Sequence, residues 1–462
     1  MTRRTFTPGK HQELMLEYAL ERPRCAWWAG MGLGKTSSAL TLLDALEEVE
    51  RGPALVLAPL RVAKSTWPRE AEKWEHLRGV RISPVVGSED ARITAIRRDA
   101  NVYTMNYENL PWLVEYLERV KKPWPFTKVI ADEATRLKNF RLRNGGQRAK
   151  VLARVAHQFV KHWVNLTGTP APNGLKDLWG QTWFLDAGAR LGRTYDAFKQ
   201  RWFQRSWDGF GLDPLQFADQ QIHDKLRDIC VTLDPADYFD IEKPLVRPVY
   251  VELPPRARAK YREMEKEMFT QIERDDIEAF NAAARTMKCL QLASGTVWVD
   301  TESKRWAELH DVKLQALESI VEEAGGMPLL VRYHWVPSRE RILKAFPGAR
   351  LLGTDPKTID DFGAGKIPML VLHAASAGHG VDGLQDGTNI LADFDHWWDL
   401  EQYDQILERI GPVRQVQSGH RRPVFRYPII ARDTVDELVL ARTETKRAVQ
   451  DLLLEAMKRR SA

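Results

Sequence analysis

Short apolar runs alternate with longer amphipathic stretches along most of the chain. The runs lie at residues 53–59, 101–105, 127–132, 163–166, 328–333, 368–374 and 388–394. Short, continuous apolar runs are typical of strands that are buried on both faces of a parallel sheet. Because the stretches between them have helical character, the order of elements predicts an α/β fold with parallel sheets.

The apolar runs form two groups, one in each half of the chain. After the first group, residues 173–229 are rich in aromatic side chains and helical in character, which predicts a helical extension of the first group. Residues 235–244 begin and end with proline and predict a hinge. We therefore expect a first domain over residues 1–235 and a second domain over residues 236–462.

Composition is typical of a soluble protein. The 462 residues are 44% apolar and 28% charged, and no apolar run approaches the ~20 residues that a membrane helix needs. Cys25, Cys230 and Cys289 lie far apart and form neither a metal-ligand pair nor a disulfide framework, which fits a reducing cytoplasm. A net charge of +5 permits nucleic-acid binding but does not require it.

The stretch from Ala29 to Thr36 carries the strongest chemical signal. Its three glycines allow a tight turn whose N–H groups point toward phosphate oxygens. Lys35 can reach the terminal phosphates, and the Thr36 hydroxyl can bind Mg²⁺. A helical stretch follows, and a helix amino terminus favours bound anions. We predict a phosphate-binding loop made of Gly30, Met31, Gly32, Leu33, Gly34, Lys35, Thr36 and Ser37.

Two carboxylates follow the apolar run at residues 127–132. We expect Asp132 to hold Mg²⁺, directly or through water, and Glu133 to orient and polarise an attacking water molecule. Acidic residues at a strand end are common and carry little information alone. Here the pair is more informative, because Asp132 lies 97 residues after Lys35. Asp132 and Glu133 would supply the metal ligand and the base that the loop lacks.

Further polar residues suit the same chemistry. The amide of Gln12 can bond an adenine edge, and the hydroxyls of Thr167 and Thr169 can sense the nucleotide state. Lys64 and Ser65 follow a predicted strand, where ligand-contacting loops lie, and they can contact a nucleic-acid backbone. Each has an ordinary alternative: a surface glutamine, a turn with small polar residues, and a solvated loop.

These segments together resemble the superfamily 2 helicases and, among them, the Swi/Snf-type translocases. The resemblance rests on M-G-L-G-K-T at residues 31–36 and D-E-A-T-R-L-K-N at residues 132–139. Four further segments occur in the same order as in the family: Gln12, A-P-L at 58–60, N-Y-E at 106–108 and L-T-G-T-P at 166–170. Thr135 departs from the pattern, because the family usually has histidine there.

The resemblance implies two RecA-like lobes with an ATP cleft between them, and ATP and Mg²⁺ as cofactors. It implies that Arg409 acts as a finger on the γ-phosphate, with Arg414 as a partner shifted from the usual spacing. Coupling to the nucleotide state would involve Thr167, Thr169 and Gln405, and Gly380 would contact the nucleotide. The nucleic-acid contacts that it implies are Lys64, Ser65, Asn106, Tyr107, Ser376 and Gly378.

The implied activity is ATP hydrolysis coupled to tracking along double-stranded DNA. Because the resemblance covers nearly the whole chain, we expect a minimal core of the bacteriophage or bacterial type, in the cytoplasm of a prokaryotic or phage-infected cell. Two alternatives stay open: a helicase that separates RNA or DNA strands and, from another class, a P-loop kinase or nucleotide-switched scaffold. The sequence identifies no protein partner and no membrane contact.

Overall fold

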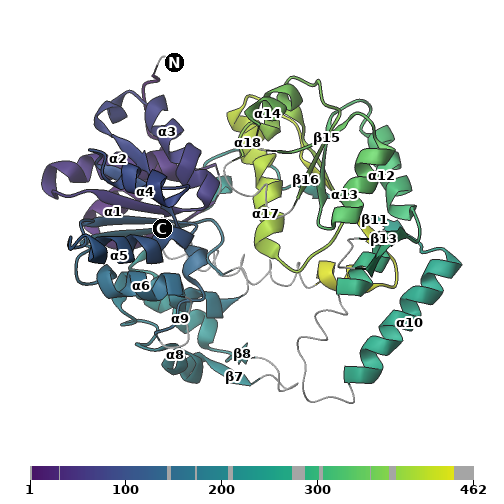
Figure 1. Cartoon of the computed structure of the whole chain (residues 1–462), viewed down its shortest axis with the longest axis horizontal. Helices are drawn as coiled ribbons and strands as arrows, with labels where there is room; N and C mark the ends of the chain where they lie inside the picture. Colours follow the sequence, from purple (N-terminus) through teal and green to yellow (C-terminus); the bar gives the residue numbers. More distant parts are fainter. Residues whose placement is uncertain are drawn as a thin grey trace. The chain divides into compact units, whose positions relative to one another are not determined.

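The chain forms two compact units, the first ending at Asp240 and the second beginning at Ile241 (Figure 1). The computed structural model describes residues 3–30, 32–142, 147–171, 174–205, 212–272, 287–300, 305–353, 355–373 and 381–441. Each unit is built on a parallel sheet with helices packed against it. The predicted α/β class with two parallel-sheet lobes is therefore confirmed.

Seven parallel strands form the sheet in the described part of the first unit. Most of their residues are fully buried, as the apolar runs predict. The strand order is β3 (Ile82–Pro84), β4 (Val102–Asn106), β2 (Ala54–Ala58), β5 (Lys128–Asp132), β6 (His162–Thr167), β1 (Arg24–Ala29) and β9 (Cys230–Leu233).

Successive residues of these strands enter two different cores, one on each face of the sheet. On β1, Trp27 packs into one core and Trp28 into the other. The first core includes side chains of α1 (Lys10–Glu21), α2 (Lys35–Val49) and α3 (Trp67–Lys73). The second includes side chains of α4 (Glu89–Ile96), α5 (Leu110–Arg119), α6 (Gln147–Ala156) and α7 (Leu178–Asp186).

In its described part, the aromatic segment after β6 is mainly helical and includes a pair of antiparallel strands. It contains α7, α8 (Tyr195–Trp202) and α9 (Ala218–Leu226), and the antiparallel pair β7 (Phe203–Arg205) and β8 (Leu212–Pro214). Strand β9 then returns to the sheet and pairs with β1. The sequence did not predict this strand, because four residues next to a helix give too short an apolar pattern.

The sheet of the second unit is also parallel along all of its described strands. Its order is β10 (Leu245–Val246), β18 (Phe425–Ala431), β17 (Ile390–Asp393), β14 (Leu329–Tyr333), β16 (Met369–His373) and β15 (Ala349–Leu351), with β11 (Val249–Val251) also on β18. A separate antiparallel hairpin consists of β12 (Thr296–Asp300) and β13 (Arg305–Glu308).

The described helices of the second unit differ in length. They are α10 (Pro255–Ile272), α12 (Val312–Glu323), α13 (Val336–Ala345), α14 (Pro356–Gly363), α16 (Leu384–Gly387), α17 (Leu400–Arg409) and α18 (Pro412–Gln417). Of the helices described in either unit, none combines the length and the apolar character needed to cross a membrane.

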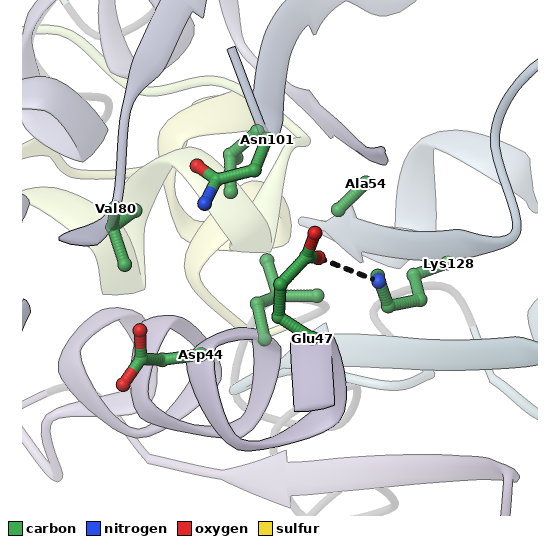
Figure 2. Close-up of a pocket in the computed structure, with 8 residues that line it drawn as sticks. Asp44, Glu47, Ala54, Val80, Asn101 and Lys128 are labelled. Atoms are coloured by element: carbon green, nitrogen blue, oxygen red, sulfur yellow. Dashed lines mark hydrogen bonds and ion pairs between the residues drawn. The ribbon is translucent and has the colours of Figure 1, made fainter. Parts of the chain in front are cut away.

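A buried lysine lies at the edge of the first sheet where its parallel strands begin (Figure 2). Lys128, the first residue of β5, is 1% exposed and lies 2.9 Å from a carboxylate oxygen of Glu47 on α2. Its Nζ atom also donates to the carbonyl of Glu50 at 2.6 Å. These bonds compensate the burial of the charge and fix the end of α2 to the start of β5.

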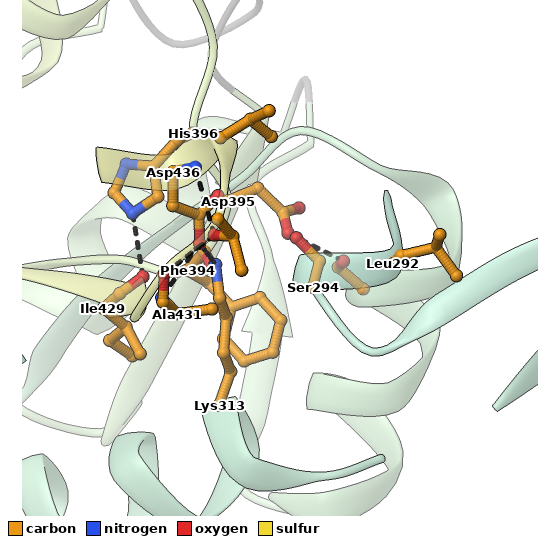
Figure 3. Close-up of polar contacts among 12 residues, drawn as sticks. Leu292, Ser294, Lys313, Phe394, Asp395, His396, Ile429, Ala431 and Asp436 are labelled. Atoms are coloured by element: carbon orange, nitrogen blue, oxygen red, sulfur yellow. Dashed lines mark hydrogen bonds and ion pairs between the residues drawn. The ribbon is translucent and has the colours of Figure 1, made fainter. Parts of the chain in front are cut away.

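A buried polar network joins the strands of the second unit (Figure 3). Lys313 on α12 pairs with Asp436 at 2.7 Å, and both side chains are at most 1% exposed. Lys313 also donates to the carbonyl of Phe394, while His396 bonds the carbonyl of Ile429. The segment after β17 is thereby tied to α12 and to the end of β18.

Asp393, the last residue of β17, lies between two buried arginines. Its oxygens are 2.9 Å from Nε of Arg332 and 2.6 Å from Nε of Arg426. Burial alone would raise the pKa of Asp393, but the two guanidinium charges outweigh it and hold the pKa below its ordinary value. Neighbouring strands β14, β17 and β18 are thus joined by a charge network inside the sheet.

We predict that Asp393→Asn strongly destabilises the second unit. The substitution leaves two buried guanidinium groups without their counter-charge, and breaking such a pair costs about 3–5 kcal/mol. Urea unfolding should show a clear fall of the midpoint. The control is Asp361→Asn, which removes an ion pair with the exposed Lys366 and should change the midpoint much less. Equal effects of the two substitutions would contradict the structural role of Asp393.

Candidate nucleotide-binding site

The predicted catalytic residues of the first unit follow the carboxyl ends of neighbouring strands. In a parallel sheet these ends share one edge, which is where ligands bind in open α/β folds. The register places Trp28 of β1 beside Thr167 of β6, and Asp132 of β5 beside Leu166 of β6. The loop after β1 and the acidic pair at the end of β5 therefore lie at the same edge, separated by the end of β6.

The loop between β1 and α2 has the backbone that its glycines predict. Gly32 and Gly34 have φ angles of 83° and 70°, in the left-handed region that glycine adopts without strain. A Cβ atom on Gly34 would lie 2.3 Å from Nε2 of Gln12, so a side chain there would displace Gln12. Leu33 is fully buried, and Met31 lies outside the described residues. The turn brings the amino terminus of α2 to the end of β1.

The side chain of Lys35 turns back over this loop. Its Nζ atom donates to the carbonyl oxygens of Ala29 at 2.5 Å and Gly30 at 3.0 Å. Thr36 follows in the first turn of α2 and is half-buried. A glycine turn, a helix amino terminus and an ammonium group are the donors that a polyphosphate requires, so these residues fit a nucleoside triphosphate.

Gln12 lies against the same loop, although it belongs to α1. Its Nε2 atom donates to Oγ of Ser37 at 3.3 Å, and its Oε1 atom accepts the N–H of Gly9 at 2.9 Å. Ser37 donates to the carbonyl of Gly34 at 2.8 Å. The structure thus brings the predicted adenine-binding glutamine together with the predicted phosphate loop.

The segment predicted as a hinge also packs on this loop. A Cβ atom on Gly30 would lie 2.6 Å from ring carbons of Pro235, so the two residues are in close contact. The ring of His11 lies 5.0 Å from Tyr238 and 5.8 Å from Phe239, and burial lowers its pKa. The sequence did not predict these contacts, because proline-bounded residues at a domain boundary resemble a solvated linker.

Asp132 is held by two aromatic side chains from the segments that follow β2 and β4. The indole N–H of Trp67, the first residue of α3, donates to Oδ2 of Asp132 at 3.0 Å. The hydroxyl of Tyr107, which follows β4, donates to the backbone carbonyl of Asp132 at 2.9 Å. Burial, and then the charge of Asp132, raise the pKa of Tyr107 well above its ordinary value, so the phenol stays protonated and can donate.

Glu133 stands directly after β5 in a rare backbone conformation. Its φ and ψ angles are 54° and 56°, a left-handed geometry that costs energy in a residue with a side chain. Such strain is concentrated at functional sites. Thr135, which replaces the usual histidine of the family, is 1% exposed in the short helix Ala134–Leu137. The turn redirects the chain immediately after the two carboxylates.

Thr167 and Thr169 lie at the end of β6, next to the acidic pair. The hydroxyl of Thr167 accepts the backbone N–H of Thr169 at 3.1 Å, and the two side chains are 1% and 8% exposed. Gln181 of α7 donates to the carbonyl of Pro170 at 2.6 Å and holds the segment that follows. The coupling role of the two threonines stays a prediction.

The residues predicted to contact nucleic acid differ in exposure. Lys64 is exposed in the turn Val62–Thr66, and Ser65 in the same turn donates to the carbonyl of Arg61 at 2.8 Å. Asn106 and Tyr107 are 6% and 2% exposed, so most of their surface is already used inside the unit. Their contacts with nucleic acid stay predictions. The predicted residues outside the described part of the chain are Ser376, Gly378 and Gly380.

The arginines predicted for phosphate contact lie in the second unit. Arg409 is the last residue of α17 and is half-buried, and Gln405 one turn earlier is 6% exposed. Arg414 on α18 pairs with Asp382 at 2.8 Å. Gln415 beside it is buried and donates to the carbonyl of Thr388 at 2.9 Å. The finger role of Arg409 and the partner role of Arg414 stay predictions.

The donor set at the edge of the first sheet also fits Mg²⁺. This ion prefers oxygen ligands and is usually held by one or two carboxylates together with substrate phosphates. Asp132 offers a carboxylate, and Thr36 offers a hydroxyl beside the phosphate loop. The hydrogen bond from Trp67 to one carboxylate oxygen is the type of supporting contact that orients a metal ligand.

Known proteins share these features. Residues 23–291, more than half of the chain, match the model of the SNF2-related domain. A protein named p41 from Acyrthosiphon pisum secondary endosymbiont phage 1 is 55% identical over 99% of this chain and its own full length. The mouse SWI/SNF-related matrix-associated actin-dependent regulator of chromatin subfamily A member 1 is 25% identical over 92% of this chain, which spans 41% of that protein.

Among solved structures, the Sulfolobus solfataricus SWI2/SNF2 ATPase core in complex with dsDNA matches with a TM-score of 0.43 and 21% identity. The alignment covers 98% of this chain and 95% of that one. The family match confirms the predicted Swi/Snf-type resemblance and, with it, the predicted class of enzyme, a helicase-like ATP hydrolase. The chain belongs to the SNF2-related domain family.

Proposed function

We propose that this chain is an ATP-driven motor that tracks along double-stranded DNA. The observation that carries the proposal is the gathering of three groups at one sheet edge: the glycine loop with Lys35, the amide of Gln12, and the acidic pair Asp132 and Glu133. Phosphoryl transfer needs positioning and charge stabilisation more than covalent chemistry, and these groups supply both.

Lys35, Thr36 and Asp132 hold the nucleotide and its metal ion in this proposal. The ammonium group of Lys35 exchanges the carbonyls of Ala29 and Gly30 for the terminal phosphates. Mg²⁺, when bound, neutralises charge on the phosphate oxygens. The N–H groups at the start of α2 donate to the same oxygens, and Glu133 accepts a hydrogen bond from water and aligns it for attack.

The second unit completes the site in this proposal. Arg409 reaches the γ-phosphate, and an arginine supplied in this way is worth a factor of ~10³–10⁵ in rate. Arg414 can join it only by leaving Asp382, to which it is bound in this structure. The state of the nucleotide is then sensed by Thr167, Thr169 and Gln405. Through these residues, ATP binding and hydrolysis change how the two units hold the nucleic acid.

The proposed grip on DNA runs mostly through phosphates. Lys64 is exposed in the turn after β2, at the edge that also carries the nucleotide site. Contacts of this kind position a protein on the duplex but carry no sequence information. Each neutralised phosphate releases counterions, so binding should weaken steeply with salt and depend little on sequence.

We predict that Lys35→Ala and Glu133→Gln each abolish turnover. The first removes the charge that binds the terminal phosphates, and the second removes the base while it preserves the shape of the side chain. Steady-state hydrolysis measures the loss, and a fluorescent ATP analogue should still bind to Glu133→Gln. The controls are Lys122→Ala and Glu115→Gln, two exposed residues of the same unit. Full hydrolysis by either site variant would show that the catalytic site is elsewhere.

We predict that duplex DNA stimulates ATP hydrolysis more than single-stranded DNA or structured RNA, and more at low than at moderate salt. The test is hydrolysis with each nucleic acid at two salt concentrations, beside a sample with none. A preference for RNA or single strands would favour a strand-separating helicase. No stimulation by any of them would contradict the motor proposal and favour a kinase or a nucleotide-switched scaffold.

A further inference from the structure

The turn between β2 and α3 connects a candidate DNA contact to the candidate metal ligand. Its residues Val62–Thr66 form one turn of π-helix, closed by the N–H of Trp67 on the carbonyl of Val62. A π-turn contains one residue more than an α-turn, and it often marks a functional position. In this turn Lys64 is exposed, whereas Trp67 at its end is fully buried.

The inner side of this turn is fixed to the sheet. Thr104 of β4 donates to the carbonyl of Ala63 at 2.6 Å, and both residues are buried. Trp67 packs in the core formed with α2 and β2, and its indole N–H donates to Oδ2 of Asp132 at 3.0 Å. An indole N–H can only donate, so this bond fixes the position of one acceptor oxygen of the carboxylate.

A second bond restrains the same residue from the next strand. The buried phenol of Tyr107 donates to the backbone carbonyl of Asp132 at 2.9 Å. The side chain and the main chain of Asp132 are therefore held by the segments that follow β2 and β4. The sequence predicts contacts with nucleic acid in both of these segments.

We propose that Trp67 is a positioning residue that orients Asp132 for Mg²⁺ and couples the metal site to DNA contact at the turn Val62–Thr66. The inference rests on the proposed function and identifies one route by which duplex DNA stimulates hydrolysis. A phosphate bound at Lys64 restrains the exposed side of the turn, whose inner side is already bonded to the sheet. The restrained turn holds Trp67 more firmly, and its indole N–H holds the orientation of the Asp132 carboxylate.

The test replaces Trp67 by phenylalanine, which keeps an aromatic ring in the core and removes the indole donor. The matched control is Trp179→Phe, which removes another buried indole donor of the first unit, bonded to the carbonyl of Gly192 at 2.8 Å. Both variants lose one buried hydrogen bond, so a purely structural effect should be similar in the two.

The first readout does not require turnover. Binding of a fluorescent, non-hydrolysable ATP analogue is measured against Mg²⁺ concentration, with and without duplex DNA. Loss of a group that supports a metal ligand typically weakens metal binding ~10–100-fold. We therefore expect Trp67→Phe to need at least ~10-fold more Mg²⁺ for half-maximal binding, whereas Trp179→Phe should match the wild-type chain. Duplex DNA should lower the Mg²⁺ requirement of the wild-type chain but not that of Trp67→Phe.

An unchanged Mg²⁺ requirement in Trp67→Phe would overturn the positioning role. A wild-type Mg²⁺ requirement that does not respond to DNA would overturn the coupling. If DNA does not stimulate hydrolysis, the proposed function and the coupling are both overturned. The positioning role is tested separately, because the Mg²⁺ titration without DNA does not depend on motor activity. If Trp67→Phe does not fold, Tyr107→Phe removes the second bond to Asp132 and should raise the Mg²⁺ requirement in the same direction.

Discussion

The structure of the first unit depends on one geometric constraint: parallel strands end at a common edge. Because β1, β2, β4, β5 and β6 all run in the same direction, the segments that follow them meet at one edge of the sheet. At the opposite edge, the buried Lys128 pairs with the exposed Glu47 and donates to the carbonyl of Glu50, which joins the start of β5 to the end of α2. One edge therefore stabilises the fold, and the other is available for chemistry.

One residue at the site edge has a backbone conformation that costs free energy: Glu133 is left-handed, which is unfavourable for a residue with a side chain. Lys35 donates to carbonyls of its own loop. Neighbouring contacts keep these conformations in place: Gln12 fills the space beside Gly34, Pro235 packs on Gly30, and Trp67 bonds Asp132. A bound nucleotide would give Lys35 and the loop N–H groups better partners, so the site is organised before its ligand arrives.

Local patterns in the sequence predicted the residues of the candidate site but not the hydrogen bonds between them. Glycines before Lys35 and carboxylates after an apolar run can be recognised within a few residues, because backbone freedom and strand burial are local properties. Trp67 and Asp132 are 65 residues apart, and no periodicity indicates that their side chains touch. The packing of Tyr238 on His11 was missed for the same reason, since it joins segments distant in sequence. Strand β9 was missed because its apolar pattern is only four residues long.

The central claim is that a nucleotide-bound Mg²⁺ is held between the loop after β1 and the end of β5. Ferrous ion in place of Mg²⁺ tests it directly, because with ascorbate and peroxide it produces radicals that cut the nearby backbone. In the presence of a non-hydrolysable ATP analogue, we expect cuts within residues 30–37 and near Asp132, and their loss in Asp132→Ala. Nucleotide-dependent cuts confined to other segments would contradict the account.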